Sequence, residues 1–172
     1  MEQSKQDALE VINTRRSTRS FKPDPVGAKD VHDLLEAAMN APSAINEQAW
    51  QFVVLSGRVL EDYLRINGNT PEGAPVAILV CEDLGAEKAR GYAVQDCAAA
   101  TQNLLLAAHA KGLGAVWTTV FPDNAAAVRA LLGIPATVVP FACVPVGIPT
   151  ARARSKSRFD EKKVHVQAWG KR

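Results

Sequence analysis

Residues 76–81 form an unbroken apolar run, Val-Ala-Ile-Leu-Val-Cys, which follows Pro75 and precedes the acidic pair Glu82-Asp83. A short apolar run bounded in this way, rich in β-branched residues, predicts a β-strand. The run is far shorter than the roughly 18 apolar residues of a membrane-spanning helix. It therefore indicates a strand within a folded domain.

Three further strands are predicted, at 51–55, 115–120 and 138–146. The first is short and rich in aromatic and β-branched residues, which is typical of a buried strand. The last contains Pro140 and Pro145, and proline lacks the N–H group that a β-ladder needs. We therefore expect the last strand at an edge or a bulge, and not in the centre of a sheet.

Helices are predicted before and between these strands. From Ala28 onward, Val31, Leu34, Leu35 and Ala38 follow the i, i+3, i+4, i+7 spacing of an amphipathic helix. Similar reasoning predicts helices at 7–13, 59–66, 91–111 and 123–132, and a loop at 67–73.

The longest predicted helix, 91–111, is rich in alanine, so that another backbone can approach it closely. Gly112 follows it and is typical of the left-handed residue that ends a helix. We expect its inward face to hold Val94, Ala98, Leu105 and Ala108.

The length of 172 residues predicts a single domain over residues 1–172. The hydrophobic content of 47 % and the charged content of 22 % are ordinary for a soluble globular protein. The first residues lack the apolar core of a signal peptide, so we expect a cytoplasmic protein with no membrane contact. The net charge of +2 is too balanced to indicate binding to nucleic acid.

An odd number of widely spaced cysteines, each in an apolar segment, argues against a disulfide framework or a zinc site. We expect Cys81, Cys97 and Cys143 to be small core residues of a reduced protein. No metal is expected, because the histidines lack ligand spacing and are predicted to be structural or superficial: His32, His109 and His165.

Residues 150–172 are polar and basic, with apolar side chains spaced too widely to form a core of their own: Phe159, Val164, Val166 and Trp169. Two interpretations stay open for this tail. It is frayed, as termini commonly are, or it packs on another surface such as a second subunit. The tryptophan close to the end favours packing.

Several catalytic motifs are missing from the sequence: a Gly-x-Ser-x-Gly elbow, a P-loop and a Gly-x-Gly-x-x-Gly dinucleotide turn. Two basic clusters with hydroxyl groups remain, Arg-Arg-Ser-Thr-Arg at 15–19 and Lys-Ser-Arg at 156–158. Each is suited to half of an anion site, because guanidinium groups make forked hydrogen bonds to phosphate. The alternative is that each cluster is a solvated basic face.

A third polar segment is the loop 41–50, Ala-Pro-Ser-Ala-Ile-Asn-Glu-Gln-Ala-Trp, which leads into the strand at 51–55. Its Ser43, Asn46 and Gln48 offer hydroxyl and amide groups that suit a flat heterocycle with carbonyls and ring nitrogens. The alternative is a helix-to-strand turn with local side-chain bonds.

Taken in order, these segments resemble the FMN-dependent nitroreductase family over nearly the whole chain. Residues 15–21 are similar to its opening flavin motif, and 41–50 to its Ala-Pro-Ser-x-x-Asn-x-Gln-Pro-Trp loop. Residues 96–119 resemble its central helix and the following strand, and 156–158 match its Lys-x-Arg. The chain has Ala49 where the family usually has proline, and it is short for the family.

The resemblance implies an α+β fold with a central, mostly antiparallel sheet flanked by helices. It also implies an intertwined homodimer in which residues 150–172 form an extended, exchanged arm that clamps the partner. The sites then lie at the interface, with the 42–46 loop of one subunit over the flavin of the other.

The same resemblance implies roles at the flavin. Arg15, Ser17, Lys156 and Arg158 would hold the phosphate and ribityl chain, with Arg16 in support. Arg19 would lie near N1 and O2 of the ring, where a cation stabilises the reduced, anionic flavin. Asn67 or Asn69 would reach the pyrimidine edge. The full implied set is Arg15, Arg16, Ser17, Arg19, Pro42, Ser43, Ala44, Asn46, Asn67, Trp117, Thr118, Thr119, Lys156 and Arg158.

The implied activity is a ping-pong oxidoreductase reaction. NADH or NADPH reduces FMN, and a nitroaromatic or quinone then takes the two electrons from the same face. Two alternatives stay open: a flavin-storing or flavin-sensing protein without turnover, and a relative that dehydrogenates or fragments a specialised substrate.

Overall fold

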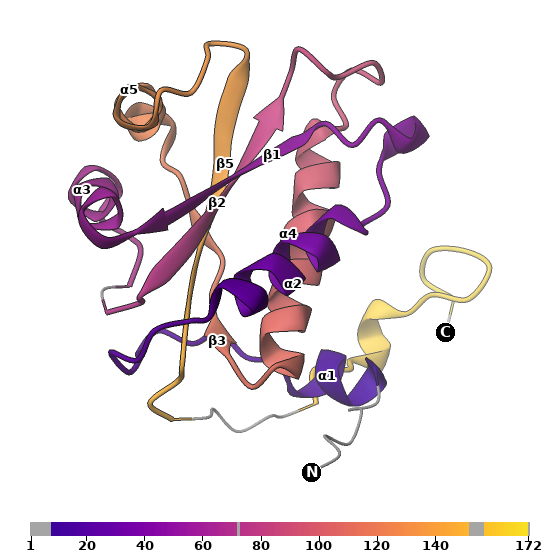
Figure 1. Cartoon of the computed structure of the whole chain (residues 1–172). Coiled ribbons are helices and arrows are strands. Elements are labelled where there is room, and N and C mark those ends of the chain that lie inside the picture. Colours follow the sequence, from indigo (N-terminus) through magenta and orange to yellow (C-terminus); the bar gives the residue numbers. More distant parts are fainter. Residues whose placement is uncertain (1–7, 72, 152–156, 172) are drawn as a thin grey trace.

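The computed structural model describes residues 8–71, 73–151 and 157–171. Within these residues the core is an antiparallel sheet with strand order β1-β2-β5-β3, in which β4 also pairs with β5 (Figure 1). The strands are β1 (Trp50–Ser56), β2 (Val76–Asp83), β3 (Gly114–Ala115), β4 (Thr118–Thr119) and β5 (Val138–Gly147).

Helices cover both faces of this sheet, as the predicted α+β class requires (Figure 1). On one face lie α2 (Ala28–Met39) and α4 (Ala93–Ala110), and α1 (Ala8–Thr14) contacts α4. On the other face lie α3 (Gly57–Asn67) and α5 (Ala125–Leu132).

The strand predicted most clearly from the sequence, β2, is central and buried on both faces. Because side chains alternate along a strand, Ile78 and Val80 join the core beneath α2 and α4. Ala77 and Leu79 join the core beneath α3 and α5. Both faces of the sheet are therefore closed by apolar contacts.

The last strand is not at an edge, because β5 is central and pairs with β2 on one side and with β3 and β4 on the other, whereas the bulge expected as the alternative is present. The ladder tolerates both prolines for separate reasons. Pro140 pairs with Cys81 where the register shifts, so that it lies at a bulge. Pro145 falls between the residues that pair with β3 and those that pair with β4, where the neighbouring strand is interrupted.

Two other strand predictions need correction. The strand predicted as buried, β1, is an edge strand of the single chain, and its Val54 is 45 % exposed. The strand predicted at 115–120 is split into β3 and β4 by Val116 and Trp117. In both cases the local apolar pattern is present. The neighbouring strands, however, decide how far β1 is buried and how long β3 and β4 are.

In the first half of α4, the residues that face the core differ from those predicted. Leu105 and Ala108 are buried as expected, whereas Val94 is exposed and Ala98 is only half-buried. Cys97 and Ala100 take the inward positions instead. Alanines occur on several faces of an alanine-rich helix, so the sequence does not show clearly which face is buried. Gly112 adopts the expected left-handed conformation, with φ of 76°.

The three cysteines are buried and free, in agreement with their predicted place in the core. Among the described residues, every helix is too short or too polar to cross a membrane.

The arm formed by residues 157–171, which contains the short helix η3 (Glu161–Lys163), extends away from the sheet near α1 (Figure 1). In the single chain its apolar side chains are left in solvent: Phe159, Val164, Val166 and Trp169, the last 90 % exposed.

Candidate functional site

The basic segment at 15–21 has no regular helix or strand, yet backbone hydrogen bonds fix it beside the sheet. Thr18 N donates to Ala115 O at 3.0 Å, and Lys22 N donates to Ile148 O at 2.8 Å. The contact with β3 is so close that a Cβ on Gly114 would meet the side chain of Thr18 at 2.6 Å. Glycine at position 114 is therefore needed for this segment to lie where it does.

The two predicted basic clusters meet in three dimensions. Arg15, Arg16, Ser157 and Arg158 line one open hollow of about 550 Å³, together with Ile12, Asn13, Gln102 and Phe159. The two clusters are far apart in the sequence. The arm returns to the end of α1 and so brings the second cluster beside the first. The structure thus brings together the two halves of the predicted anion site. Lys156, also predicted for this site, lies outside the described residues.

Three arginine side chains line this hollow: Arg15, Arg16 and Arg158. Burial, and then the charges of Arg158 and Arg16, lower the pKa of Arg15 below its usual value. The Nη1 atom of Arg15 is buried without a hydrogen-bond partner. Within the described chain, no ion pair is formed by Arg15 or Arg158. A half-buried guanidinium whose Nη1 donor is buried without a partner in the described chain, next to further guanidiniums, fits an anion with several acceptor oxygens.

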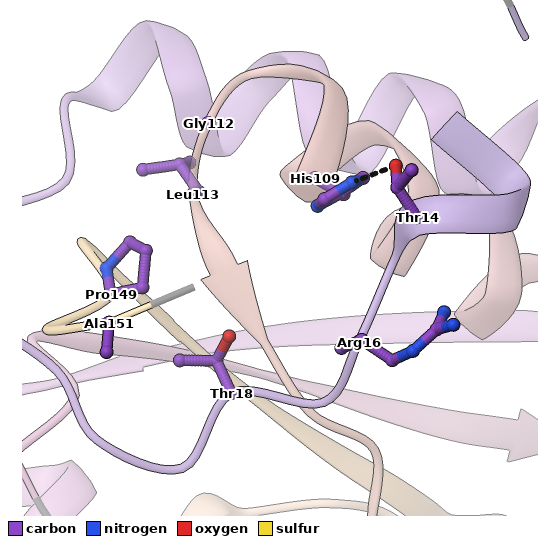
Figure 2. A pocket seen from close by; sticks show the side chains of 8 residues that line it. All are labelled: Thr14, Arg16, Thr18, His109, Gly112, Leu113, Pro149 and Ala151. Atoms are coloured by element: carbon purple, nitrogen blue, oxygen red, sulfur yellow. Dashed lines mark hydrogen bonds between the residues drawn. The ribbon is translucent and has the colours of Figure 1, made fainter. Parts of the chain in front are cut away.

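A smaller pocket adjoins this hollow, where α1 meets the end of α4 (Figure 2). Thr14 Oγ1 donates its single hydrogen to Glu10 O at 2.6 Å, so His109 Nε2, at 2.8 Å, is the donor to Thr14 Oγ1. Arg16 Nη1 donates to the carbonyl oxygens of Asn13 and Arg15. These contacts give His109 the structural role expected from sequence, and they place Arg16 in support of the segment that carries Arg15.

Within the predicted polar loop, residues 42–48 form a strained turn around the short helix η1 (Ala44–Asn46). Ile45, Asn46 and Gln48 all have positive φ, at 46°, 58° and 55°. Such a backbone is unusual for a β-branched residue such as isoleucine, and it is kept only where the surroundings enforce it. Ser43 Oγ accepts from Gln48 N at 3.0 Å, and Gln48 Nε2 donates to Asn46 Oδ1 at 3.3 Å.

Within one chain, this loop contacts the first turns of α4, whereas the basic hollow is lined by Gln102 from the middle of α4 and by residues near the end of α1. The loop is bound to the first turns of the helix by Ala44 N, which donates to Asp96 Oδ1 at 3.0 Å. The end of α1 is bound to the last turn through the contact between Thr14 and His109. A rise of 1.5 Å per residue between positions 96 and 109 separates these contacts by about 20 Å. Among the described residues of one chain, none of the loop residues 42–48 lines the basic hollow.

The pocket residues predicted from the segment after α4 lie in and beside β4, at the edge of the sheet, and they differ in how far the fold already uses their side chains. Thr118 is buried, and its Oγ1 donates to Cys143 O at 2.8 Å. Trp117 packs edge-to-face on Phe141, with ring centroids 5.5 Å apart. Thr119 is exposed, so it is the member of this group whose side chain is open to a ligand.

Asn67, the other residue predicted near the flavin, is only 2 % exposed. Its Nδ2 donates to Thr119 O at 2.9 Å, and its Oδ1 accepts from Phe121 N at 3.1 Å. Asn69 is more open, although its Nδ2 also donates to Thr119 O, at 2.8 Å. Both the nitrogen and the oxygen of the Asn67 amide form hydrogen bonds within the fold, so Asn67 has a structural role and is not proposed as a ligand contact.

One group of potential metal ligands, His32, Asp33 and Glu36, lies on the outer side of α2. Its carboxylate Asp33 already pairs with Lys29 Nζ at 2.9 Å and with Lys111 Nζ at 2.6 Å. We assign no metal to this group.

The described residues thus define an α+β protein with an antiparallel sheet, helices on both faces and a basic hollow suited to a phosphorylated ligand. Comparison with known proteins identifies the family. The sequence profile of the Nitroreductase family matches residues 12–70 and 60–148. The chain belongs to this family, as the sequence motifs predicted.

Similar proteins support the assignment over nearly the full length. A protein of Methanothermobacter thermautotrophicus with the provisional name NADH dehydrogenase/NAD(P)H nitroreductase is 43 % identical, with coverage of 96 % of this chain and 90 % of that protein. A crystal structure of a provisionally named nitroreductase from Desulfovibrio desulfuricans in complex with FMN is 32 % identical, with a TM-score of 0.77 and coverage of 92 % and 93 %. A provisionally named NADH oxidase from Clostridium acetobutylicum is 33 % identical, with a TM-score of 0.88 and coverage of 92 % and 99 %. These relatives carry the names of oxidoreductases.

Proposed function

We propose that the protein is an FMN-dependent oxidoreductase that takes electrons from NADH or NADPH and reduces nitroaromatic or quinone-like acceptors. The observation that carries this proposal is the buried, unpartnered Nη1 of Arg15 beside Arg16 and Arg158. The FMN complex of the Desulfovibrio desulfuricans relative, at 32 % identity, supports FMN as the phosphorylated ligand.

The residues of the hollow fit the phosphate of FMN. A phosphate monoester carries roughly two negative charges near neutral pH and offers three strong acceptor oxygens. Arg15 and Arg158 supply charged donors, and Ser17 and Ser157 are exposed hydroxyls nearby in sequence. Arg16 binds backbone carbonyls and so holds the segment in place. Lys156 adjoins Ser157 in the chain and would add a further cation.

The remaining roles concern the flavin ring. Arg19 is exposed, and we place it near N1 and O2, where a cation stabilises the charge of the reduced ring. Pro42, Ser43, Ala44 and Asn46 would cover the ring, and Trp117, Thr118 and Thr119 would line the pocket beneath it.

When bound, FMN would supply the hydride and two-electron chemistry of the reaction. This chain would supply position and electrostatics, which explains why no side-chain acid or base stands out in the sequence. Donor and acceptor would occupy the same face in turn, so the kinetics would be ping-pong.

The site would be completed by two chains. In one chain, no described residue of the loop at 42–48 lines the basic hollow. The exposed apolar side chains of the arm, with Phe159 75 % and Trp169 90 % exposed, also need a covering surface. A homodimer in which the arms are exchanged would satisfy both needs and place each loop over the other subunit's flavin.

The decisive experiment compares binding of FMN and riboflavin, which differ by the phosphate alone. The wild-type protein should bind FMN far more tightly than riboflavin, and Arg158→Ala should remove most of that difference while riboflavin binding changes little. Arg65→Ala is the matched control, because Arg65 pairs with Glu61 and Asp62 on α3. Equal affinity of the wild type for FMN and riboflavin would overturn the proposed phosphate site.

Turnover is tested separately with NADH or NADPH, using menadione and a nitroaromatic as acceptors. Parallel lines in double-reciprocal plots would support the ping-pong reaction. A protein that binds FMN but oxidises neither nucleotide would instead be a flavin-storing or flavin-sensing protein.

A further inference from the structure

The carboxylate of Asp96 lies in an unusual environment near the start of α4. Asp96 is 4 % exposed, and its Oδ1 accepts the hydrogen bond from Ala44 N at 3.0 Å. Its Oδ2 is buried and has no hydrogen-bond partner in the described chain. A buried carboxylate with so few hydrogen bonds costs free energy, so its presence calls for an explanation other than stability.

A second carboxylate holds the other end of the same loop. Glu47 Oε2 accepts from Lys88 N at 2.6 Å and from Ala89 N at 2.8 Å, while Glu47 Oε1 is buried and has no hydrogen-bond partner among the described residues. The residues between these two anchors include the left-handed pair Ile45 and Asn46. Ile45 is 73 % exposed. The two carboxylates therefore fasten both sides of a strained turn whose tip is open to solvent.

The anchors explain how this strain persists. A β-branched residue at positive φ is strained, and it relaxes unless the neighbouring backbone is held. Ala44 directly precedes Ile45, and its N–H is the group that Asp96 binds. A hydrogen bond to a charged acceptor is stronger than a neutral one, which suits a contact that opposes strain. The anchors thus hold the exposed tip of the loop, Ile45 and Asn46, in one conformation before a second subunit binds.

We propose that Asp96 is a positioning residue for the flavin-covering loop: its buried carboxylate fixes Ala44 N and thereby holds Ile45 and Asn46 ready to close over the flavin of the partner subunit. The inference rests on the proposed function, in which this loop covers that flavin. The first turns of α4 would then help to retain the cofactor, although Asp96 itself would contact neither FMN nor substrate.

A pre-set loop keeps the flavin by avoiding the cost of ordering the loop on binding. Loss of the Asp96 contact should therefore act mainly on the rate of FMN release. Asp96→Ala removes the acceptor and should raise the release rate by on the order of tenfold, the effect of one charge-assisted hydrogen bond. Asp96→Asn keeps an acceptor for Ala44 N and should stay within about threefold of the wild type, because a neutral acceptor retains most of the bond.

The matched control is Thr101→Val on the same helix. Thr101 is fully buried, and its hydroxyl donates to Cys97 O at 2.7 Å on its own helix and not to the loop. This variant should lower thermal stability and leave FMN release unchanged. An equal rise in the release rate for Thr101→Val and Asp96→Ala would show a general structural effect and overturn the inference. Wild-type release from Asp96→Ala would overturn it as well.

Amide hydrogen exchange of the flavin-free protein separates this inference from the proposed function. Asp96→Ala should increase exchange at residues 43–48, whereas Thr101→Val should leave this loop protected. If the wild type bound no FMN, the proposed function would fail, while the exchange of the loop would still report whether Asp96 positions it. Unchanged exchange in Asp96→Ala would show that the loop does not depend on Asp96.

Discussion

The side-chain amide of Asn67 links the end of α3 to the backbone after β4: Nδ2 donates to Thr119 O at 2.9 Å, and Oδ1 accepts from Phe121 N at 3.1 Å. The same amide also donates to Asn69 Oδ1. This link holds the segment that would line the flavin pocket, so Asn67 acts through Thr119 and Phe121.

Asn67→Ala should therefore reduce stability rather than remove a flavin contact. Phe121 N loses its partner, whereas Thr119 O keeps the bond from Asn69, so the free energy of unfolding should fall by about 2–3 kcal/mol, most of it from the unsatisfied Phe121 N. Asn69→Ala is the control, with an expected loss of about 1 kcal/mol, because Thr119 O keeps its bond to Asn67. Urea denaturation measures both. A variant with unchanged stability and lost FMN affinity would restore Asn67 as a ligand of the flavin.

Arg19→Ala should lower the two-electron reduction potential of the bound flavin by about 30–60 mV, the equivalent of one charge-assisted hydrogen bond to the reduced ring. Reduction by NADH or NADPH should also become slower. Arg158→Ala should weaken FMN binding and leave the potential of the bound flavin close to that of the wild type. Spectroelectrochemical titration distinguishes the two roles, and identical potentials for both variants would contradict them.

A chain that ends at Pro149 should lose the dimer and the flavin together. It lacks the arm with its exposed apolar side chains, and it lacks Lys156 and Arg158. The expected product is aggregated or colourless, because an interface with exchanged arms belongs to the obligate class that buries more than roughly 2,000 Å². Mass in solution and flavin content measure the effect, with a chain ending at Trp169 as the control. A soluble, yellow, monomeric truncation would show that one chain builds the site alone.

Acid stability should depend on Asp33. Hydrogen bonds from Lys111 and then Lys29 lower the pKa of Asp33 to about 2. A carboxylate with a lowered folded-state pKa stabilises the native state above its unfolded pKa, near 4, and loses that effect as the pH falls through about 2. Asp33→Asn should be less stable than the wild type at neutral pH, and the difference should vanish between about pH 4 and about pH 2.

Denaturation in urea over a series of pH values tests this prediction. Asp123→Asn is the control, because Asp123 is exposed and forms no ion pair in the part of the chain described here. A difference between Asp33→Asn and the wild type that stayed constant down to pH 2 would contradict a role for the charge.

The local elements were readable from the sequence wherever the apolar pattern was strong. The run at 76–81 became β2, the set around Leu34 became α2, and Gly112 and Gly133 adopt the left-handed conformation after α4 and α5. The position of a strand within the sheet was not readable. Pro140 and Pro145 suggested an edge or bulge, yet β5 is central because a bulge and an interrupted neighbour accommodate them. Strand order depends on pairings between distant segments, which no local pattern encodes.

The sequence by itself determined the family and the chemistry of the basic clusters, because specific residue types at specific spacings carry both. Only the tertiary structure decided that Arg15 and Arg158 meet in one hollow, that the Nη1 atom of Arg15 is left without a partner, and that Asp96 binds the covering loop. These facts depend on burial and on contacts between residues up to 143 positions apart (158 minus 15). Burial sets the cost of an unpaired charge, and burial is a property of the packed chain that the order of its residues does not display.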